Sequence, residues 1–381
     1  MRARPVLPAL LAAFLAAAGC THPASTLTSE PSQPLAPLPP PTHVGHVFVI
    51  VLENEGYAAT FEANPPPSPY LARNLTAMGR LLPNYYGIGH NSLGNYIAMT
   101  SGQGPNAATQ DDCGVYAEFR GSMGGPDGQA VGQGCVYPRD VVDVGTQLSQ
   151  ANHTWKAYAE DMANSPGSAP TSCRHGALDS EERWGGGSAT DQYATRHEPF
   201  VYYHGVIDDA ASCSAHVVDL KVLLDDLANG TVPEFSFLTP DACSDGHDNP
   251  CADPKQPGGF AGIDQFLRTW VPRILASPAY QKDGLLLVLF DEADTEPPQN
   301  AEACCGEGPG PNAPMPGLYG PGGGRMGAVL VSRCLEPGSK DETAVNHYGF
   351  LRTVEDIFHL APQGYAATAK AIGLGDCAPT P

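Results

Sequence analysis

Three unbroken apolar runs constrain the fold of this chain more than any other feature. They cover residues 46–52, 285–290 and 327–332, and Val, Leu, Ile and Phe dominate them. Runs of this kind are typical of strands buried on both faces, as in a parallel sheet covered by helices. Residues 235–238 and 154–158 add two weaker strand predictions.

Helical patterns lie between the predicted strands. Apolar residues recur at helical spacing in residues 141–151, 214–228, 263–276 and 348–360. Strands that alternate with helices predict an α/β fold, a three-layer sandwich with a mostly parallel central sheet. A chain of 381 residues is long enough for one large domain of this class.

The N-terminus has the features of an export signal. Arg2 and Arg4 precede an apolar run at residues 7–18, which is too short to span a membrane. The run ends at Ala-Ala-Gly-Cys20, which is similar to the cleavage and lipidation site of bacterial lipoproteins. We therefore expect a signal peptide at residues 1–19, with membrane anchoring through lipid on Cys20, or simple cleavage and secretion.

Proline and glycine mark two segments as irregular. Residues 20–43 are rich in Pro, Ser and Thr and predict a disordered tether ahead of one folded domain at residues 44–381. Residues 295–325 are dense in Gly and Pro and show little apolar pattern. A loop of this length inside a compact domain is typical of a functional lid or a disordered insertion.

Cysteine usage also favours an oxidising compartment. The chain has 11 Cys, and setting Cys20 aside leaves an even number, enough for up to five disulfides. We expect the adjacent Cys304 and Cys305 to bridge to other cysteines. A zinc site is disfavoured because the sequence has no CxxC pair. Sequence spacing favours two local pairs, Cys113 with Cys135 and Cys243 with Cys251.

The formal net charge of −21 excludes a general nucleic-acid binder, because an acidic surface repels phosphate. The same repulsion would act on a phosphate-ester substrate. A site for such a substrate on this chain needs a positive centre, which a bound cation with histidines would supply.

Acidic groups follow three of the predicted strands. Glu53-Asn54 follows residues 46–52, and Asp291-Glu292 follows residues 285–290. Residues 235–238 lead to Asp241, Asp245 and His247. One such pair alone is typical of a turn or a helix cap. Three at the same edge of a parallel sheet would repel one another without a cation, so together they predict a metal site.

A serine stands where a nucleophile is needed. Ser92 precedes a short apolar run, which places it near the start of a predicted helix. Backbone N–H groups at a helix N-terminus bind phosphate, and a metal contact lowers the pKa of a hydroxyl. Asn95 lies one turn further on. The alternative is that Ser92 serves only as a helix N-cap.

The ordered motifs resemble those of the bacterial phosphoesterase family, which comprises secreted acid phosphatases and phosphatidylcholine-type phospholipases C and is related to the alkaline phosphatase superfamily. The resemblance lies in residues 51–54, 92–96, 240–248, 290–292 and 347–358. It implies that Ser92 is the nucleophile. It also implies a metal site whose ligands are Glu53, Asn54, Ser92, Asp291 and Glu292. Oxygen-rich ligation of this kind suits a hard divalent cation such as Mg²⁺, Ca²⁺ or Mn²⁺.

The remaining site residues also follow from the resemblance. Asn95 and Asp245 are expected to bind the substrate phosphate, and His247 to assist the leaving group. His197 is expected either to bind phosphate or to be structural. His347 is expected to serve the site or to cap its helix.

The sequence thus predicts an exported, metal-dependent acid phosphatase that acts through a phosphoserine. Two alternatives stay open. A phospholipase C would use the same nucleophile but cleave on the other side of phosphorus. A non-catalytic surface lipoprotein would lack a nucleophile, whereas Ser92 is present.

Overall fold

A computed structural model describes residues 41–164, 171–181, 188–294 and 300–377. The predicted signal peptide at 1–19 and nearly all of the tether at 20–43 lie outside these residues. The described chain is built on an 8-stranded sheet with the order β11-β2-β10-β9-β1-β8-β6-β7. No described helix is both long and apolar enough to cross a membrane.

The predicted strands form the middle of this sheet. β1 (His46–Leu52) lies between β9 (Gly284–Phe290) and β8 (Phe235–Thr239) and is parallel to both. All three strands are almost completely buried, which explains their unbroken apolar sequences. Leu52 pairs with Phe290, so the residues that follow β1 and β9 leave the sheet at the same edge.

One predicted strand runs in the opposite direction to its neighbours. β10 (Ala328–Ser332) is buried, but it pairs with β9 in antiparallel orientation. A parallel neighbour would need a crossover that returns the chain to the other edge of the sheet, usually through a helix. The described part of the segment between β9 and β10 contains no helix. The chain therefore turns back and β10 pairs directly with β9 in antiparallel orientation.

Shorter strands complete the sheets. β6 confirms the weaker prediction at residues 154–158, while β2 and β11 extend the other edge. Two small two-stranded sheets lie outside the main one, β12 with β3 and β4 with β5. The bounds are β2 (Arg80–Leu82), β3 (Tyr85–Tyr86), β4 (Arg120–Ser122), β5 (Val131–Gln133), β6 (Trp155–Ala159), β7 (Val217–Asp219), β11 (Ser339–Lys340) and β12 (Val345–Asn346).

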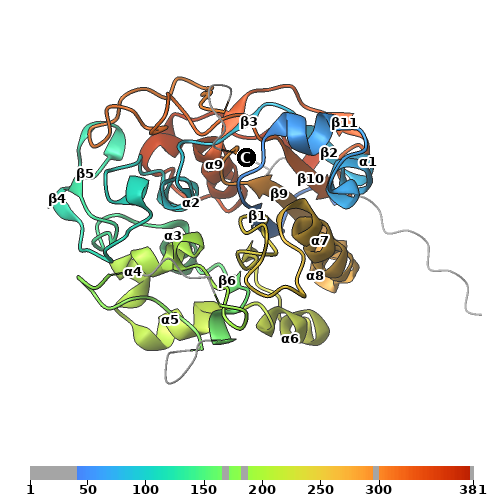
Figure 1. Cartoon of the computed structure of the whole chain (residues 1–381), viewed down its shortest axis with the longest axis horizontal. Coiled ribbons are helices and arrows are strands. Elements are labelled where there is room, and N and C mark those ends of the chain that lie inside the picture. The colour runs from blue at the N-terminus through green and yellow to red at the C-terminus, as the bar shows by residue number, and fades with distance from the viewer. Residues whose placement is uncertain (1–40, 165–170, 182–187, 295–299, 378–381) are drawn as a thin grey trace, which may run out of the picture. The chain divides into compact units, whose positions relative to one another are not determined.

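Helices cover the sheet on two sides, which confirms the three-layer α/β architecture. Figure 1 shows α2, α3 and α9 on one side of β1 and β9, and α7 and α8 on the other. α7 buries Ile263, Phe266, Leu267, Trp270 and Ile274, which share one face at helical spacing. The helices are α1 (Thr76–Met78), α2 (Ser92–Ser101), α3 (Val144–Gln150), α4 (His204–Ile207), α5 (Ala210–His216), α6 (Val222–Asn229), α7 (Gly259–Ala276), α8 (Pro278–Asp283) and α9 (His347–Ile357).

The single helix predicted at residues 214–228 is wrong. The segment instead contains the end of α5, the strand β7 and α6. Val217 and Val218 are β-branched, and they pair with Ala157 and Tyr158 at the edge of the sheet. Sheet pairing therefore outweighs the helical periodicity here.

Five disulfides join described cysteines. The predicted pairs Cys113–Cys135 and Cys243–Cys251 are confirmed. The expectation for Cys304 and Cys305 is wrong, because these neighbours pair with each other. The backbone turns at Cys305, whose φ of 68° is in the left-handed region, and this turn brings the two sulfurs together. The other pairs are Cys173–Cys213 and Cys334–Cys377.

Candidate active site

The ends of three strands are tied together at one edge of the sheet. The N–H of Glu53, after β1, donates to the carbonyl of Asp245, after β8, at 3.0 Å. The N–H of Asp291, after β9, donates to the carbonyl of Leu52 at 2.9 Å. With Glu292, this edge carries four carboxyl side chains, and each is 2% exposed or less.

Ser92 points at this group of carboxylates. α2 begins at Ser92, as predicted, and Asn91 before it has a strained backbone with φ of 70°. The Ser92 hydroxyl donates to Glu53 Oε2 at 2.8 Å. One turn along α2, the Tyr96 hydroxyl donates to Glu53 Oε1 at 2.8 Å. The helix start thus aims one hydroxyl at the cluster while a second fixes the same carboxylate.

Asn95 holds Glu292 in place. Its Nδ2 donates to Glu292 Oε2 at 2.9 Å, and its Oδ1 accepts the N–H groups of Ile88 and Gly89. His90 Nδ1 lies 3.4 Å from Glu292 Oε1. In this arrangement the amide expected to bind phosphate is bonded to protein groups at both ends.

His197 lies between two of the carboxylates. Its Nδ1 is 3.0 Å from Asp245 Oδ2, and its Nε2 is 3.4 Å from Glu53 Oε1. The ring stacks on Tyr96 with centroids 5.5 Å apart. Burial, then the nearby Arg196, lowers its pKa well below the usual value, so the ring is neutral and suited to bind a cation.

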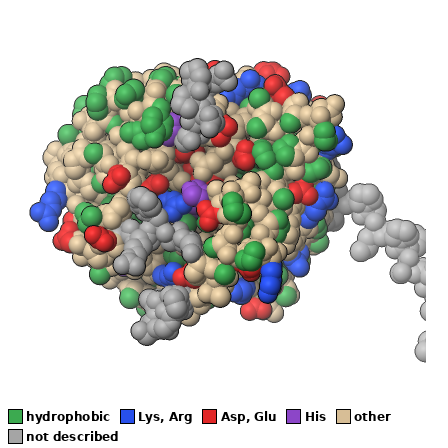
Figure 2. Space-filling model, in the orientation of Figure 1, with side chains coloured by type: hydrophobic (Ala, Val, Ile, Leu, Met, Phe, Trp, Pro, Cys, Tyr) green, Lys and Arg blue, Asp and Glu red, His purple; other side chains and the backbone are tan. Residues whose placement is uncertain are grey.

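His247 lies at the outer side of the site. Gly246 has φ of 108°, and a side chain there would clash with Ile263, so glycine allows the tight turn between Asp245 and His247. His247 Nδ1 lies 2.8 Å from Asp248 Oδ1. Figure 2 shows a histidine among acidic and basic side chains near the middle of the visible face.

His347 lies behind the carboxylates rather than among them. Its Nε2 lies 2.5 Å from the carbonyl of Asp291, and its Nδ1 lies 3.0 Å from the Tyr85 hydroxyl. Burial lowers its pKa to about 4, so the ring is neutral and donates from Nε2. This geometry fixes the backbone of Asp291 and offers no free nitrogen to a substrate.

The backbone of Asn54 also helps to orient Asp291. Its N–H donates to Asp291 Oδ1 at 3.3 Å, and its φ of 60° is in the left-handed region, which Asn tolerates. The N–H of Glu292 donates to the same oxygen at 2.7 Å. Asp291 is thereby oriented on one side while its Oδ2 is left for another partner.

Two residues of this site carried no assigned role in the sequence. Arg196 is 6% exposed, and its Nη2 lies 3.1 Å from His247 Nε2. Its Nε lies 3.7 Å from Asp112 Oδ2, and Asp112 Oδ1 accepts the N–H of Leu93 at 3.0 Å. Arg196 directly precedes His197 in sequence, and that adjacency is the one signal that pointed to it.

The electrostatics of the carboxylates favour the binding of a cation. Burial raises the pKa of Asp291 to about 7, and burial with neighbouring carboxylates raises the pKa values of Glu53 and Glu292 well above normal. The buried Oδ2 atoms of Asp291 and Asp245 accept no hydrogen bond from the described residues. Glu53, His197 and Asp245 form a group of ligand atoms within 4.8 Å of one another. An oxygen-rich donor set of this kind fits a hard divalent cation.

Comparisons with known proteins agree with these motifs. A family model described as "Phosphoesterase family" matches residues 68–361. The chain is 26% identical over 223 residues to "Phosphate-repressible acid phosphatase" of Penicillium chrysogenum, covering 58% of this chain and 43% of that one. It is 24% identical over 371 residues to "Phosphatidylinositol-3-phosphatase" of Mycobacterium tuberculosis, covering 97% of this chain and 93% of that one.

The chain therefore spans less than half the length of the Penicillium relative but most of the mycobacterial one. Among solved structures, it is similar to an alkaline phosphatase superfamily protein from Vibrio parahaemolyticus. That likeness has 12% identity and a TM-score of 0.48, and it covers 88% of this chain and 73% of that one. Since the family match extends over most of its length, the chain belongs to the Phosphoesterase family.

Proposed function

We propose that this protein is a metal-dependent acid phosphatase that hydrolyses phosphate monoesters through a phosphoserine on Ser92. The observation that carries the proposal is the hydrogen bond of 2.8 Å from the Ser92 hydroxyl to Glu53, inside a buried cluster of carboxylates at a helix N-terminus. A structural N-cap has no need of such a cluster. The relatives named acid phosphatase support the monoester specificity.

The proposed cation would be held by oxygens from two strand ends and α2. Its ligands would come from Glu53, Asn54, Ser92, Asp291 and Glu292, as the family resemblance implies. The proximity of His197 and Asp245 to Glu53 makes both further candidates. When bound, the cation would neutralise the carboxylates and withdraw electron density from the Ser92 oxygen. Mg²⁺, Ca²⁺ and Mn²⁺ all suit oxygen ligands.

The chemistry would take two steps. The Ser92 oxygen forms a bond to phosphorus while the bond from phosphorus to the alcohol oxygen breaks. The Ser92 proton leaves along the existing hydrogen bond to Glu53. Water then attacks the phosphoserine, which releases inorganic phosphate and returns the proton to Ser92.

Arg196 and His247 would act on the phosphoryl group and the leaving alcohol. Arg196 is a buried guanidinium close to the carboxylates, and it can donate two parallel hydrogen bonds to a phosphate. His247 Nε2 cannot carry a proton while it accepts from Arg196 Nη2. We therefore propose that Arg196 turns to the bound phosphate, which frees His247 to protonate the alcohol.

A phospholipase C activity is the alternative for the same nucleophile. Assays of phosphatidylcholine beside a simple phosphomonoester separate the two, because only the lipase releases diacylglycerol. The two relatives named above are both phosphatases, which favours the monoesterase.

We also propose that the protein is exported. Five disulfides among the described residues support an oxidising compartment. The mass of the mature protein tests this proposal, since cleavage ahead of Cys20 removes residues 1–19. An intact N-terminus in cells would contradict it.

The main experiment compares Ser92→Ala with wild type on a chromogenic phosphomonoester. Loss of the nucleophile should lower kcat by about 10⁴-fold or more. Ser101→Ala, in the same helix, is the matched control and should keep its activity. A rapid acid quench should trap phosphate on Ser92 in wild type only. Full activity in a folded Ser92→Ala protein would overturn the proposal.

A further inference from the structure

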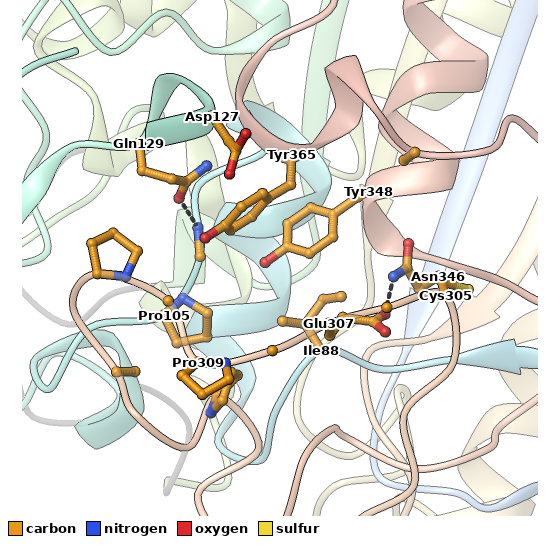
Figure 3. Close-up of a pocket in the computed structure, with 18 of the residues that line it drawn as sticks. Ile88, Pro105, Asp127, Gln129, Cys305, Glu307, Pro309, Asn346, Tyr348 and Tyr365 are labelled. Atoms are coloured by element: carbon orange, nitrogen blue, oxygen red, sulfur yellow. Dashed lines mark hydrogen bonds between the residues drawn. The ribbon is translucent and has the colours of Figure 1, made fainter. Parts of the chain in front are cut away.

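A second cavity lies apart from the carboxylate cluster. It has a volume of about 290 Å³ and is lined by the loop at residues 305–316 together with α9 and the segment at residues 364–369. Figure 3 shows Tyr348 and Tyr365 at its centre, with Asp127 on one side and Glu307 on another. None of the proposed catalytic residues lines it.

One wall of the cavity is aromatic. The rings of Tyr348 and Tyr365 pack edge to face with centroids 5.1 Å apart. Tyr348 is buried and Tyr365 is half-buried. Within the described parts of the chain, neither hydroxyl makes a hydrogen bond to a protein group, so both oxygens can accept from a ligand. Such a wall attracts cations through the faces of the rings.

The charge of the lining has one sign. Asp127 and Glu307 both line the cavity, and no Lys, Arg or His does. Among described residues neither carboxylate has an ion-pair partner; Glu307 Oε1 accepts only the amide of Asn346. Negative charge beside aromatic rings therefore favours a positively charged ligand.

The side-chain amides of the lining already donate hydrogen bonds to protein groups. Gln129 donates to the carbonyl of Gly102 at 2.9 Å, and Asn312 donates to the carbonyl of Ala130 at 2.7 Å. Asn346 donates to Glu307. With no Lys, Arg or His in the lining and two carboxylates in it, charge disfavours a second phosphate site here.

The ligand groups also argue against a metal ion. At this cavity, the described residues that lie close enough together to bind a metal ion are Cys304, Cys305 and Glu307. Both sulfurs are joined in a disulfide, so neither can act as a thiolate ligand. A single remaining carboxylate is too few for a specific site.

We propose that this cavity binds a small organic ammonium group, held by the faces of Tyr348 and Tyr365 and by the charges of Asp127 and Glu307. The volume suits a ligand of a few heavy atoms, at the lower end of small-molecule sites. The proposal is independent of the phosphatase activity, because the cavity shares no residue with the proposed catalytic group.

Choline is the probe, with its uncharged isostere 3,3-dimethylbutan-1-ol as the matched ligand, and calorimetry on the full chain as the measurement. Choline should bind wild type, and the isostere should bind about tenfold more weakly or not at all. Glu307→Gln and Tyr365→Leu should each weaken choline binding by about tenfold. Circular dichroism and thermal melting establish that both variants are folded.

Two control variants test whether choline binding is specific to this cavity. Glu336→Gln removes an exposed carboxylate outside the cavity and should bind choline like wild type. Ser92→Ala should also bind choline normally, which keeps this test separate from the proposed reaction. The proposal is overturned if choline does not bind, if the isostere binds equally well, or if folded Glu307→Gln and Tyr365→Leu proteins both bind like wild type.

Discussion

A single buried carboxylate, Asp226, and the buried carboxylate cluster of the candidate site differ in their electrostatics. Asp226, beneath the edge of the sheet, accepts from Lys156 Nζ at 2.6 Å, from the Tyr158 hydroxyl at 2.8 Å and from the Thr231 hydroxyl at 2.7 Å. Burial opposes its ionisation, but these partners outweigh burial and lower its pKa. At the candidate site, where β1, β8 and β9 end, burial raises the pKa of Asp291 to about 7.

The difference shows how a structural carboxylate is distinguished from a functional one. The protein supplies all the partners of Asp226 from its own chain. At the candidate site it gathers Glu53, Asp245, Asp291 and Glu292 with one buried guanidinium nearby, that of Arg196, and leaves two carboxylate oxygens without hydrogen bonds from described residues. Such a cluster can be fully ionised only if a ligand supplies positive charge.

The first prediction tests whether Arg196 binds phosphate at the candidate site. Arg196→Gln should raise KM for a phosphomonoester, and the inhibition constant of inorganic phosphate, by about 10- to 100-fold, because charged hydrogen bonds to phosphate are lost. Steady-state kinetics measures both constants.

Arg174→Gln is the matched control for this prediction. Arg174 pairs with Asp191 at 2.6 Å and 3.0 Å outside the cluster, so its loss should alter stability rather than phosphate affinity. Equal effects of the two variants on KM would show that Arg196 has no specific role with phosphate.

The second prediction concerns the structural carboxylate. Asp226→Asn should lower the free energy of unfolding by about 1–3 kcal/mol at pH 7, since Lys156 loses its ionic partner, while kcat stays near wild type. Thermal melting and the phosphatase assay give the two readings.

The pH dependence of that effect follows from the lowered pKa of Asp226. A carboxylate whose pKa is lower in the folded state stabilises the fold above its unfolded pKa, about 3.9, and loses this contribution as pH falls through the folded pKa. The difference in melting temperature between wild type and Asp226→Asn should therefore shrink below about pH 4. A difference that grows as the pH falls would contradict the assignment.

Much of the fold could be predicted because it depends on local pattern. The runs at residues 46–52 and 285–290 are apolar on both faces, so burial and parallel pairing followed directly. The direction of β10 and the strand β7 could not be predicted, because both depend on which neighbour is free to pair. The bond between Cys304 and Cys305 depends on one backbone turn that leaves no pattern in the sequence.

Some residues of the candidate site could likewise be predicted from the sequence, and others could not. Glu53, Ser92 and Asp291 follow predicted strands or begin a predicted helix, and the structure brings them to one edge. Arg196 and Asp112 come from irregular segments, where periodicity gives no position. Their part in the site depends on tertiary contacts, namely those with His247 and Leu93.

Removal of divalent cations is the most direct test of the proposed metal dependence. Wild type and Asp291→Asn are treated with a chelator, assayed on a phosphomonoester, and then titrated with Mg²⁺, Mn²⁺ and Ca²⁺, with Asp226→Asn as the control. Wild type and Asp226→Asn should lose activity by about a thousandfold and recover it with at least one cation, because the cation stabilises charge in the transition state. Asp291→Asn should need much more cation and recover little activity. Full activity of wild-type protein that contains no divalent metal by elemental analysis would contradict the proposed dependence on a cation.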